Sequence, residues 1–234
     1  AEELRAPVML MSGPGEFPCN PPEVLGPVTR KLVEDATVPV ALHLDHGDSI
    51  DLVRRCLDAG YTSVMLDFSS KSFEENAGAL ADVVELARPY GATTEGEIGA
   101  VGRADDVSVE GAKESRLTEP DDARRFVAET GVDMLAVSIG NAHGFYAKLP
   151  VFDFERIAAL REAAGVPLVL HGGSGTGEDV LRRAAAGGMA KVNVASELCR
   201  AWHQTLKDQL AARTPWLPTA FGAATDAKIG RAHV

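Results

Sequence analysis

Short runs of apolar residues, each long enough for one β-strand, recur along the chain and alternate with stretches of helical periodicity. Most runs are nearly continuous in Val, Ile, Leu, Met and Ala, as is typical of strands covered on both faces. They predict seven strands, over Pro7–Met11, Val38–Leu44, Ser63–Phe68, Ala92–Ile98, Met134–Ile139, Pro167–Leu170 and Lys191–Val194. Helical patterns lie between them, among them Asp48–Ala59, Ser72–Arg88 and Asp121–Thr130.

Such an alternation implies parallel strands joined by right-handed crossovers. A doubly wound open sheet is one alternative, but its dinucleotide-binding form needs a glycine-rich turn after the first strand, and Pro14 removes an amide from Gly13-Pro14-Gly15. A (β/α)8 TIM barrel has eight strands in about 250 residues, so this chain is one βα unit of about 30 residues short. The chain also lacks an initiator Met. We therefore expect an α/β fold, a (β/α)8 TIM barrel without its first βα unit, with residues 1–234 as one N-terminally incomplete domain.

The composition is that of a globular protein and limits the classes of partner. Hydrophobic residues at 45% and charged residues at 24% exclude disorder and fibrous structure. No apolar run approaches the ~20 residues that cross a bilayer, so we expect no membrane partner. The 23 Lys and Arg against 34 Asp and Glu give a net charge of −11, and no basic cluster is present to bind a nucleic acid. A small anionic substrate stays open, because backbone amides and a metal ion can hold it locally.

The three cysteines, Cys19, Cys56 and Cys199, are far apart and have no metal-ligand spacing. This is typical of free thiols in a reducing compartment. The N-terminus has no basic-then-apolar signal region, so we expect a cytoplasmic protein.

Three histidines fall where the predicted strands end, and each is followed by glycine: His46, His143 and His171. In a barrel the carboxyl ends of all strands converge on one face, so these residues can meet despite their separation in sequence. Three imidazoles with an open fourth position form a catalytic zinc arrangement. A single histidine of this kind is more often a capping or core residue, but three at matched strand ends favour a metal. His43, His203 and His233 do not share the pattern, and His43 is expected to pack inside its strand.

Asp45 directly precedes His46. In a regular strand the two side chains would face opposite ways, whereas at a strand end that turns into a loop both can approach one site. A carboxylate beside a metal is suited to general acid–base catalysis, or to supporting a histidine ligand from behind. Both interpretations place Asp45 at the site.

Two further segments have the features of anion-binding loops. The glycine-rich run His171–Gly177 follows the strand that would be the seventh of a complete barrel, and Asn193–Ser196 follows the eighth. The loops after strands seven and eight are the usual phosphate site of this architecture. Their backbone amides, the hydroxyls of Ser174 and Ser196 and the following helix dipole are suited to hold a phosphate.

These residues belong to six motifs that occur in order along most of the chain: Ala41–Gly47 (ALHLDHG), Ser63–Ser69 (SVMLDFS), Glu95–Gly99 (EGEIG), Ile139–Gly144 (IGNAHG), His171–Gly175 (HGGSG) and Lys191–Leu198 (KVNVASEL). In them the chain resembles the class II, zinc-dependent ketose-bisphosphate aldolases, from about Pro7 to the helix after Glu197. It is most similar to the tagatose-1,6-bisphosphate branch, since fructose-1,6-bisphosphate enzymes more often have Asp at the position of Ala195.

The resemblance implies that the zinc ligands are His46, His143 and His171 and that the catalytic acid/base is Asp45. It also implies contacts to the phosphate of dihydroxyacetone phosphate, from Gly144, Gly172, Gly173, Ser174, Asn193, Val194, Ala195 and Ser196. Many members of the family use a monovalent cation, Na⁺ or K⁺, near the phosphate. Relatives are commonly dimers or tetramers, so a homodimer or homotetramer is expected.

The implied reaction is reversible aldol cleavage of a ketose 1,6-bisphosphate, of the fructose or tagatose type, to dihydroxyacetone phosphate and glyceraldehyde 3-phosphate. Zinc would act as a Lewis acid, and Asp45 would accept the proton of the C4 hydroxyl. Asp67, Glu95 and Glu97 also end strands, and could hold a second cation or pair with Arg or Lys in the barrel interior. The alternatives are a related class II aldolase acting on another phosphorylated ketose and a non-catalytic, zinc-binding paralogue.

One loop departs from the family pattern. Relatives commonly carry a Gly-Gly-x-Glu-Asp-like loop whose acidic residue is implicated in proton transfer. This chain has Ala104 near that position, followed by Asp105 and Asp106. Asp105 could substitute for the missing acid, or the substrate could differ.

Overall fold

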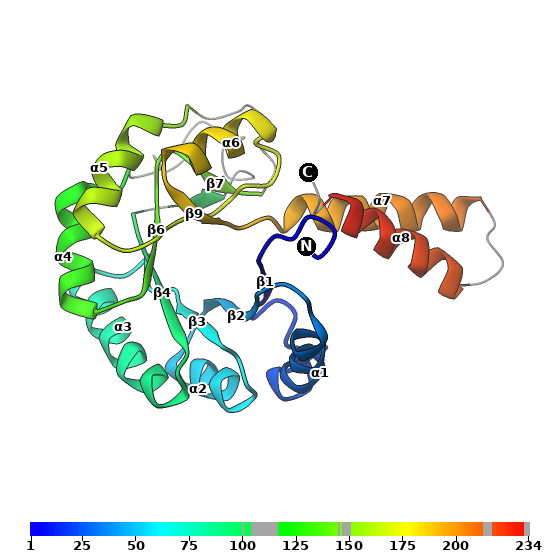
Figure 1. Ribbon diagram of the computed structural model, residues 1–234, viewed down its shortest axis with the longest axis horizontal. Coiled ribbons are helices and arrows are strands. Elements are labelled where there is room, and N and C mark those ends of the chain that lie inside the picture. The colour runs from blue at the N-terminus through cyan, green and yellow to red at the C-terminus, as the bar shows by residue number, and fades with distance from the viewer. Residues whose placement is uncertain (100, 104–116, 145, 147–150, 213–216, 232–234) are drawn as a thin grey trace.

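The protein is built around a curled parallel β-sheet with helices on its outer side (Figure 1). The computed structural model describes residues 1–99, 101–103, 117–144, 146, 151–212 and 217–231. The sheet contains, in chain order, β1 (Val8–Ser12), β2 (Val40–Gly47), β3 (Ser63–Leu66), β4 (Thr93–Ile98), β6 (Met134–Val137), β8 (Leu168–Leu170) and β9 (Met189–Val192). Each strand is parallel to the next in the order β1-β2-β3-β4-β6-β8-β9.

Helices connect successive strands: α1 (Pro22–Asp35), α2 (Ile50–Asp58), α3 (Phe73–Ala87) with the 3₁₀ turn η1 (Arg88–Tyr90), α4 (Pro120–Thr130), α5 (Phe154–Ala164) and α6 (Glu178–Gly187). All seven predicted strands are confirmed, and so are the three clearest predicted helices. A separate two-stranded parallel ladder of β5 (Gly102–Arg103) and β7 (Ala142–His143) was not predicted. Strands of two residues are too short to produce a hydrophobic pattern.

The two faces of the sheet differ in chemistry. Alternate residues such as Leu42, Leu44 and Leu135 belong to the buried cluster that the strands form with the outer helices. Gly96 faces the same way, because a Cβ atom there would overlap side chains of α3 and α4. The residues between them face the interior of the curl, and many of these are polar. The hydrophobic core therefore lies between sheet and helices, while the interior is available for chemistry.

The sheet has two free edges in the part of the chain that the structure describes. β1 pairs only with β2, and β9 pairs only with β8. In Figure 1 these edges flank the open side of the curl. The fold is thus an α/β fold with a seven-stranded, curled parallel sheet, consistent with a partial (β/α)8 barrel.

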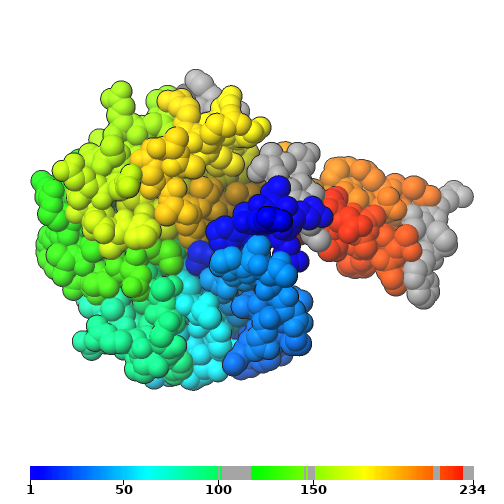
Figure 2. Space-filling model, viewed as in Figure 1, coloured from blue at the N-terminus to red at the C-terminus, as the bar shows by residue number. Residues whose placement is uncertain are grey.

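After β9 the chain forms a helical hairpin of α7 (Ser196–Ala211) and α8 (Leu217–Arg231). Figure 2 shows this hairpin extending away from the body of the molecule. Its helices pack on each other, with the Trp202 and Phe221 ring centroids 5.7 Å apart. Within the described ranges, none of the helices is long and apolar enough to span a bilayer.

Candidate active site

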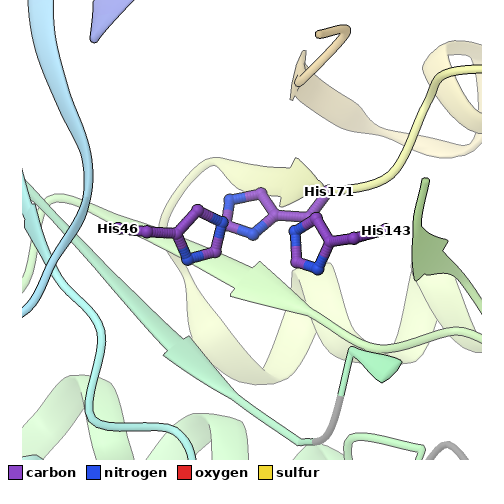
Figure 3. A group of neighbouring side chains, drawn as sticks. All are labelled: His46, His143 and His171. Carbon is purple, nitrogen blue, oxygen red and sulfur yellow. The ribbon is translucent and has the colours of Figure 1, made fainter. Parts of the chain in front are cut away.

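Three histidines from distant parts of the sequence meet at the carboxyl end of the curled sheet (Figure 3). His46 belongs to β2, His143 to β7, and His171 directly follows β8. The ring centroid of His46 lies 4.9 Å from that of His143 and 4.7 Å from that of His171. The ring centroids of His143 and His171 are 5.5 Å apart. One nitrogen of each ring lies within 4.8 Å of the others, close enough for a single metal ion to bind all three.

A β-bulge brings Asp45 and His46 to the same site. We expected the strand to end at Leu44, but β2 continues to Gly47 with an irregular register between Leu44 and Gly47. His46 has a φ of 48°, a left-handed conformation that is costly for a residue with a side chain. Bulges of this kind redirect side chains next to active sites. The correction to the prediction is therefore local: the strand changes direction through a bulge instead of ending in a loop.

Two of the three histidines use one ring nitrogen to contact a carboxylate. Nδ1 of His46 donates to Asp67 Oδ2 over 2.6 Å, and Nε2 of His171 lies 2.9 Å from Glu95 Oε1. This is the usual arrangement of metal-binding histidines, in which the second nitrogen is held by a carboxylate or carbonyl. It leaves Nε2 of His46 and Nδ1 of His171 for a ligand.

Several buried polar atoms at this point have no hydrogen-bond partner among the described residues. They are His143 Nε2, His171 Nδ1 and Glu97 Oε2. Glu97 Oε2 lies 2.7 Å from His171 Nδ1 but is not aligned for a hydrogen bond. Buried polar atoms without partners are costly, and a cation between them would satisfy them. The residues present therefore fit a metal ion with nitrogen ligands, for which zinc is well suited.

The environment of the histidines shifts their pKa values in opposite directions. Burial lowers the pKa of His143 to about 4, so its ring is neutral near pH 7, the form that binds a metal. Burial also lowers the pKa of His171, but the adjacent carboxylates of Glu95 and Glu97 outweigh it and raise the value to about 10. For Asp67, burial is outweighed by hydrogen bonds from His46 and Ser69, which hold its pKa well below the ordinary range.

Asp45 is half-buried beside the histidines. Its Oδ1 atom accepts a hydrogen bond of 2.9 Å from Asn193 Nδ2, which fixes the carboxylate relative to the loop after β9. The other amide atom, Asn193 Oδ1, is buried and has no partner among the described residues. Asp45 and Asn193 thus present one acceptor each to anything bound in front of the histidines.

The two glycine-rich and serine-containing loops lie side by side. Gly173 N donates to Asn193 O over 2.9 Å, and Ser174 Oγ accepts from the amides of Ala195 and Glu197 over 3.1 and 3.3 Å. The loops are adjacent as the sequence suggested. These two amides, however, are already bonded to Ser174, so they are not free to bind an anion while Ser174 keeps this position. Val194 and Ser196 are half-buried in the same loop, and Gly144, with a φ of 95°, directly follows His143.

Tyr146 holds together the segments that carry His143 and His171. Its hydroxyl accepts from Ala142 N over 2.9 Å and lies within donating distance of two carbonyl oxygens, Ala142 O at 2.7 Å and Gly172 O at 2.9 Å. Burial raises the pKa of this phenol, so it stays a donor. The hydroxyl is therefore a bridge between β7 and the loop after β8.

We predict that Tyr146→Phe destabilises the protein by about 1–3 kcal/mol, because it leaves the amide of Ala142 and two carbonyls without their partner. Urea unfolding measures the change. Tyr90→Phe serves as the matched control, since Tyr90 is exposed and bonds only Asp58 among the described contacts. Equal, small effects of both changes would show that the bridge contributes nothing.

A polar group deeper in the interior contains Lys191, which was not singled out from the sequence. Lys191 donates to Glu95 Oε2 over 2.6 Å and contacts His43 Nε2 at 3.2 Å. His43 was expected to be packed inside its strand; it is fully buried and its Nδ1 lies 2.8 Å from Ser63 Oγ. A usable signal was present, because His43 precedes Asp45 by two positions and Lys191 precedes Asn193 by two, and residues two apart in an extended chain share a face.

The three carboxylates at strand ends have different partners. Glu95 pairs with Lys191, as one of the two interpretations of the sequence proposed, and Asp67 bonds His46. Asp67, Glu97 and His46 also form a second group whose ligand atoms lie within 4.8 Å of one another. Ala104, Asp105 and Asp106 lie outside the described residues.

We predict that protein stability depends on the titration of His43. Burial lowers its pKa to about 4. The unfolded chain takes up a proton at this ring near pH 6.5, but the folded protein does so only near pH 4, so stability falls as the pH is lowered through this interval. Between pH 7.5 and 5 this ring accounts for about 2 kcal/mol.

Urea unfolding at the two pH values tests this prediction. The loss of stability on acidification should be smaller in His43→Gln by about that amount, while His203→Gln, a change at an exposed ring of α7, should behave like the unaltered protein. An unchanged pH dependence in His43→Gln would contradict the prediction.

Comparison with known proteins identifies the family and agrees with the fold. Residues 1–231 match the family model described as class II fructose-bisphosphate aldolase. The YdjI aldolase of Escherichia coli K12 is similar over 97% of this chain and 80% of its own, with 34% identity and a TM-score of 0.85. A protein of Coccidioides immitis proposed to be a fructose-1,6-bisphosphate aldolase is similar over the same shares, with 30% identity and a TM-score of 0.86.

The fructose-bisphosphate aldolase of Campylobacter jejuni, at 20% identity, shares the fold over 99% of this chain and 82% of its own, with a TM-score of 0.79. The family match spans nearly the whole chain, including all three histidines and Asp45. The resemblance inferred from the sequence motifs is confirmed, and the enzyme class follows from it, since aldolases are lyases. The chain belongs to the class II fructose-bisphosphate aldolase family.

Proposed function

We propose that this enzyme catalyses zinc-dependent, reversible aldol cleavage of a ketose 1,6-bisphosphate, of the fructose or tagatose type, to dihydroxyacetone phosphate and glyceraldehyde 3-phosphate. The observation that carries the proposal is the convergence of three imidazoles, with buried nitrogens that have no partner, next to the half-buried carboxylate of Asp45. Zinc held by His46, His143 and His171 would supply Lewis acidity toward the C2 carbonyl oxygen of the ketose.

In this mechanism Asp45 accepts the proton of the C4 hydroxyl. The C3–C4 bond then breaks, its electron pair stays with C3, and C4 becomes the aldehyde carbon of glyceraldehyde 3-phosphate. Protonation of C3 completes dihydroxyacetone phosphate. Asn193 holds Asp45 through its amide nitrogen, and its free Oδ1 atom is suited to accept a hydrogen bond from a substrate hydroxyl.

We assign the substrate phosphate to the loops after β7, β8 and β9, with contacts from Gly144, Gly172–Ser174 and Asn193–Ser196. Binding would require an anion to compete with Ser174 for the amides of Ala195 and Glu197. The net charge of −11 favours a monovalent cation, Na⁺ or K⁺, beside the phosphate, and the carbonyl oxygens of Ala142 and Gly172, which converge on one hydroxyl, are suitable ligands.

We further propose that the curled sheet is the larger part of a (β/α)8 barrel, with the place of the remaining βα unit between β1 and β9. Both edges that would flank this unit lack a second partner among the described strands. Val24, Val28 and Leu32 form an exposed apolar stripe on α1 that the helix of such a unit would cover. Exposed Leu210, Leu217 and Phe221 on the α7–α8 hairpin favour contact with a second copy in a homodimer or homotetramer.

The test is an assay of the enzyme stripped by a chelator and reloaded with stoichiometric zinc. Fructose and tagatose 1,6-bisphosphates and other phosphorylated ketoses are offered in parallel, and released dihydroxyacetone phosphate is measured. Cleavage should disappear on chelation and return with zinc. A zinc-loaded protein that cleaves none of these sugars would overturn the proposal and favour a non-catalytic zinc-binding paralogue.

A further inference from the structure

A line of buried polar side chains crosses the interior beneath the three histidines. It starts at Ser63 on β3 and passes through His43 on β2, Lys191 on β9 and Glu95 on β4 to His171 after β8. The side chains of His43, Glu95 and His171 are 0% exposed and that of Lys191 is 9% exposed. Such a group is stable only if each donor meets an acceptor.

The direction of every hydrogen bond in this line is fixed by its members. The ammonium of Lys191 can only donate, so both His43 Nε2, at 3.2 Å, and Glu95 Oε2, at 2.6 Å, must accept from it. A carboxylate can only accept, so the His171 nitrogen 2.9 Å from Glu95 Oε1 must carry a proton. That nitrogen is Nε2, so in the neutral ring Nδ1, which lies 2.7 Å from Glu97 Oε2, has the lone pair that a metal ion needs.

Lys191 also fixes the orientation of the Glu95 carboxylate. One oxygen of Glu95 accepts from the ammonium and the other faces His171 Nε2. With a partner at each oxygen, the carboxylate cannot rotate freely. Without Lys191, the partner left to the same oxygen among the described contacts is His43 Nε2, 3.5 Å away. The described contacts of Lys191 are with His43 and Glu95, not with the three clustered histidines or the substrate loops. The orientation of Glu95 nevertheless depends on Lys191, and the orientation of the His171 ring depends on Glu95.

We infer that Lys191 is a positioning residue of the metal centre, which acts through Glu95 to hold His171 with its proton on Nε2 and Nδ1 directed to the metal ion. The inference rests on the proposed metal site and is independent of the substrate. It assigns a function to a buried cation that the aldol mechanism does not use.

The test measures zinc binding and the protonation of His171 without measuring catalysis. Zinc affinity is determined by competition with a chromophoric chelator for the unaltered enzyme, Lys191→Met, Glu95→Gln and the double variant. We expect each single change to weaken zinc binding about 10- to 100-fold. Because Lys191 acts through Glu95, the double variant should bind zinc about as weakly as Glu95→Gln alone.

A control and a second measurement separate this function from general stability. Arg156→Met removes a half-buried ion pair with Asp153 and Glu119 and should lower stability without changing zinc affinity. In the zinc-loaded enzyme labelled with ¹⁵N-histidine, His171 should carry its proton on Nε2. A proton found on Nδ1 instead would overturn the inference even if Lys191→Met does not fold.

Results of two kinds, from the spectrum and from zinc binding, would overturn the inference. One is a proton on Nδ1 of His171 in the zinc-loaded enzyme. The other is zinc affinity in Lys191→Met equal to that of the unaltered enzyme, or losses that add in the double variant, as expected if Lys191 stabilises the fold alone. An enzyme that binds zinc as expected but cleaves no ketose bisphosphate would contradict the proposed function and leave this inference standing.

Discussion

Replacing Asp45 with asparagine is expected to lower kcat by roughly 10²- to 10⁴-fold, the contribution of a positioned acid–base group. The amide has the shape of the carboxylate, and its oxygen can still accept the hydrogen bond from Asn193. It cannot take a proton from a substrate hydroxyl. We therefore expect zinc affinity and unfolding free energy to change little, so that the loss falls on the chemical step.

Steady-state kinetics with the preferred ketose bisphosphate, together with zinc titration, checks this expectation. Asp48→Asn is the matched control, because Asp48 is exposed three residues further along and bonds only Ser49 among the described contacts. A kcat for Asp45→Asn within about threefold of the unaltered enzyme would exclude Asp45 as the acid–base residue.

Gly172→Ala is expected to abolish measurable activity and to reduce stability by several kcal/mol. Gly172 has a φ of 68°, and a Cβ atom there would overlap the backbone carbonyl of Ala142. Backbone cannot move aside as a side chain can, so the loop after β8 and β7 must separate. These segments carry His171 and His143, and displacements of about 1 Å cost on the order of 10²-fold in rate.

Gly177→Ala provides the comparison for this effect. Gly177 lies in the same loop with a φ of 85°, but a Cβ atom there meets nothing within 4 Å. It should show only the cost of its backbone conformation, with φ 85° and ψ 157°, about 1–3 kcal/mol, with activity largely kept. Chemical unfolding and zinc affinity of the two variants give the measurement. Similar behaviour of both would show that the close approach of the loops is unimportant.

The strands were predictable from the sequence because the face of each that packs against the helices is apolar. Leu42, Leu44, Leu168 and Leu170 are buried as the pattern indicates. The clustering of His46, His143 and His171 was predictable for a topological reason, since parallel strands place their carboxyl ends on one side of the sheet. The family could be inferred because its motifs contain these same strand ends.

What the sequence could not provide depends on contacts between distant segments. The bulge at His46 has no marker in the local pattern, because a left-handed φ at a histidine is held by its surroundings. The ladder of β5 and β7 is two residues long on each strand, too short to leave a pattern in the sequence. The bond of Lys191 to Glu95 joins residues 96 positions apart, and no local rule pairs them.

The position of Lys191 has a mechanical consequence. Strands β2, β4 and β9 are not adjacent in the sheet, yet their side chains bond one another across the interior. Main-chain hydrogen bonds between adjacent strands tolerate a range of bending. A side-chain bond across the interior restrains the distance between non-adjacent strands, and therefore the curvature of the sheet. The ammonium of Lys191 thus contributes both to the curvature of the sheet and to the alignment of a proposed ligand, so a change that flattens the sheet also turns the imidazole of His171.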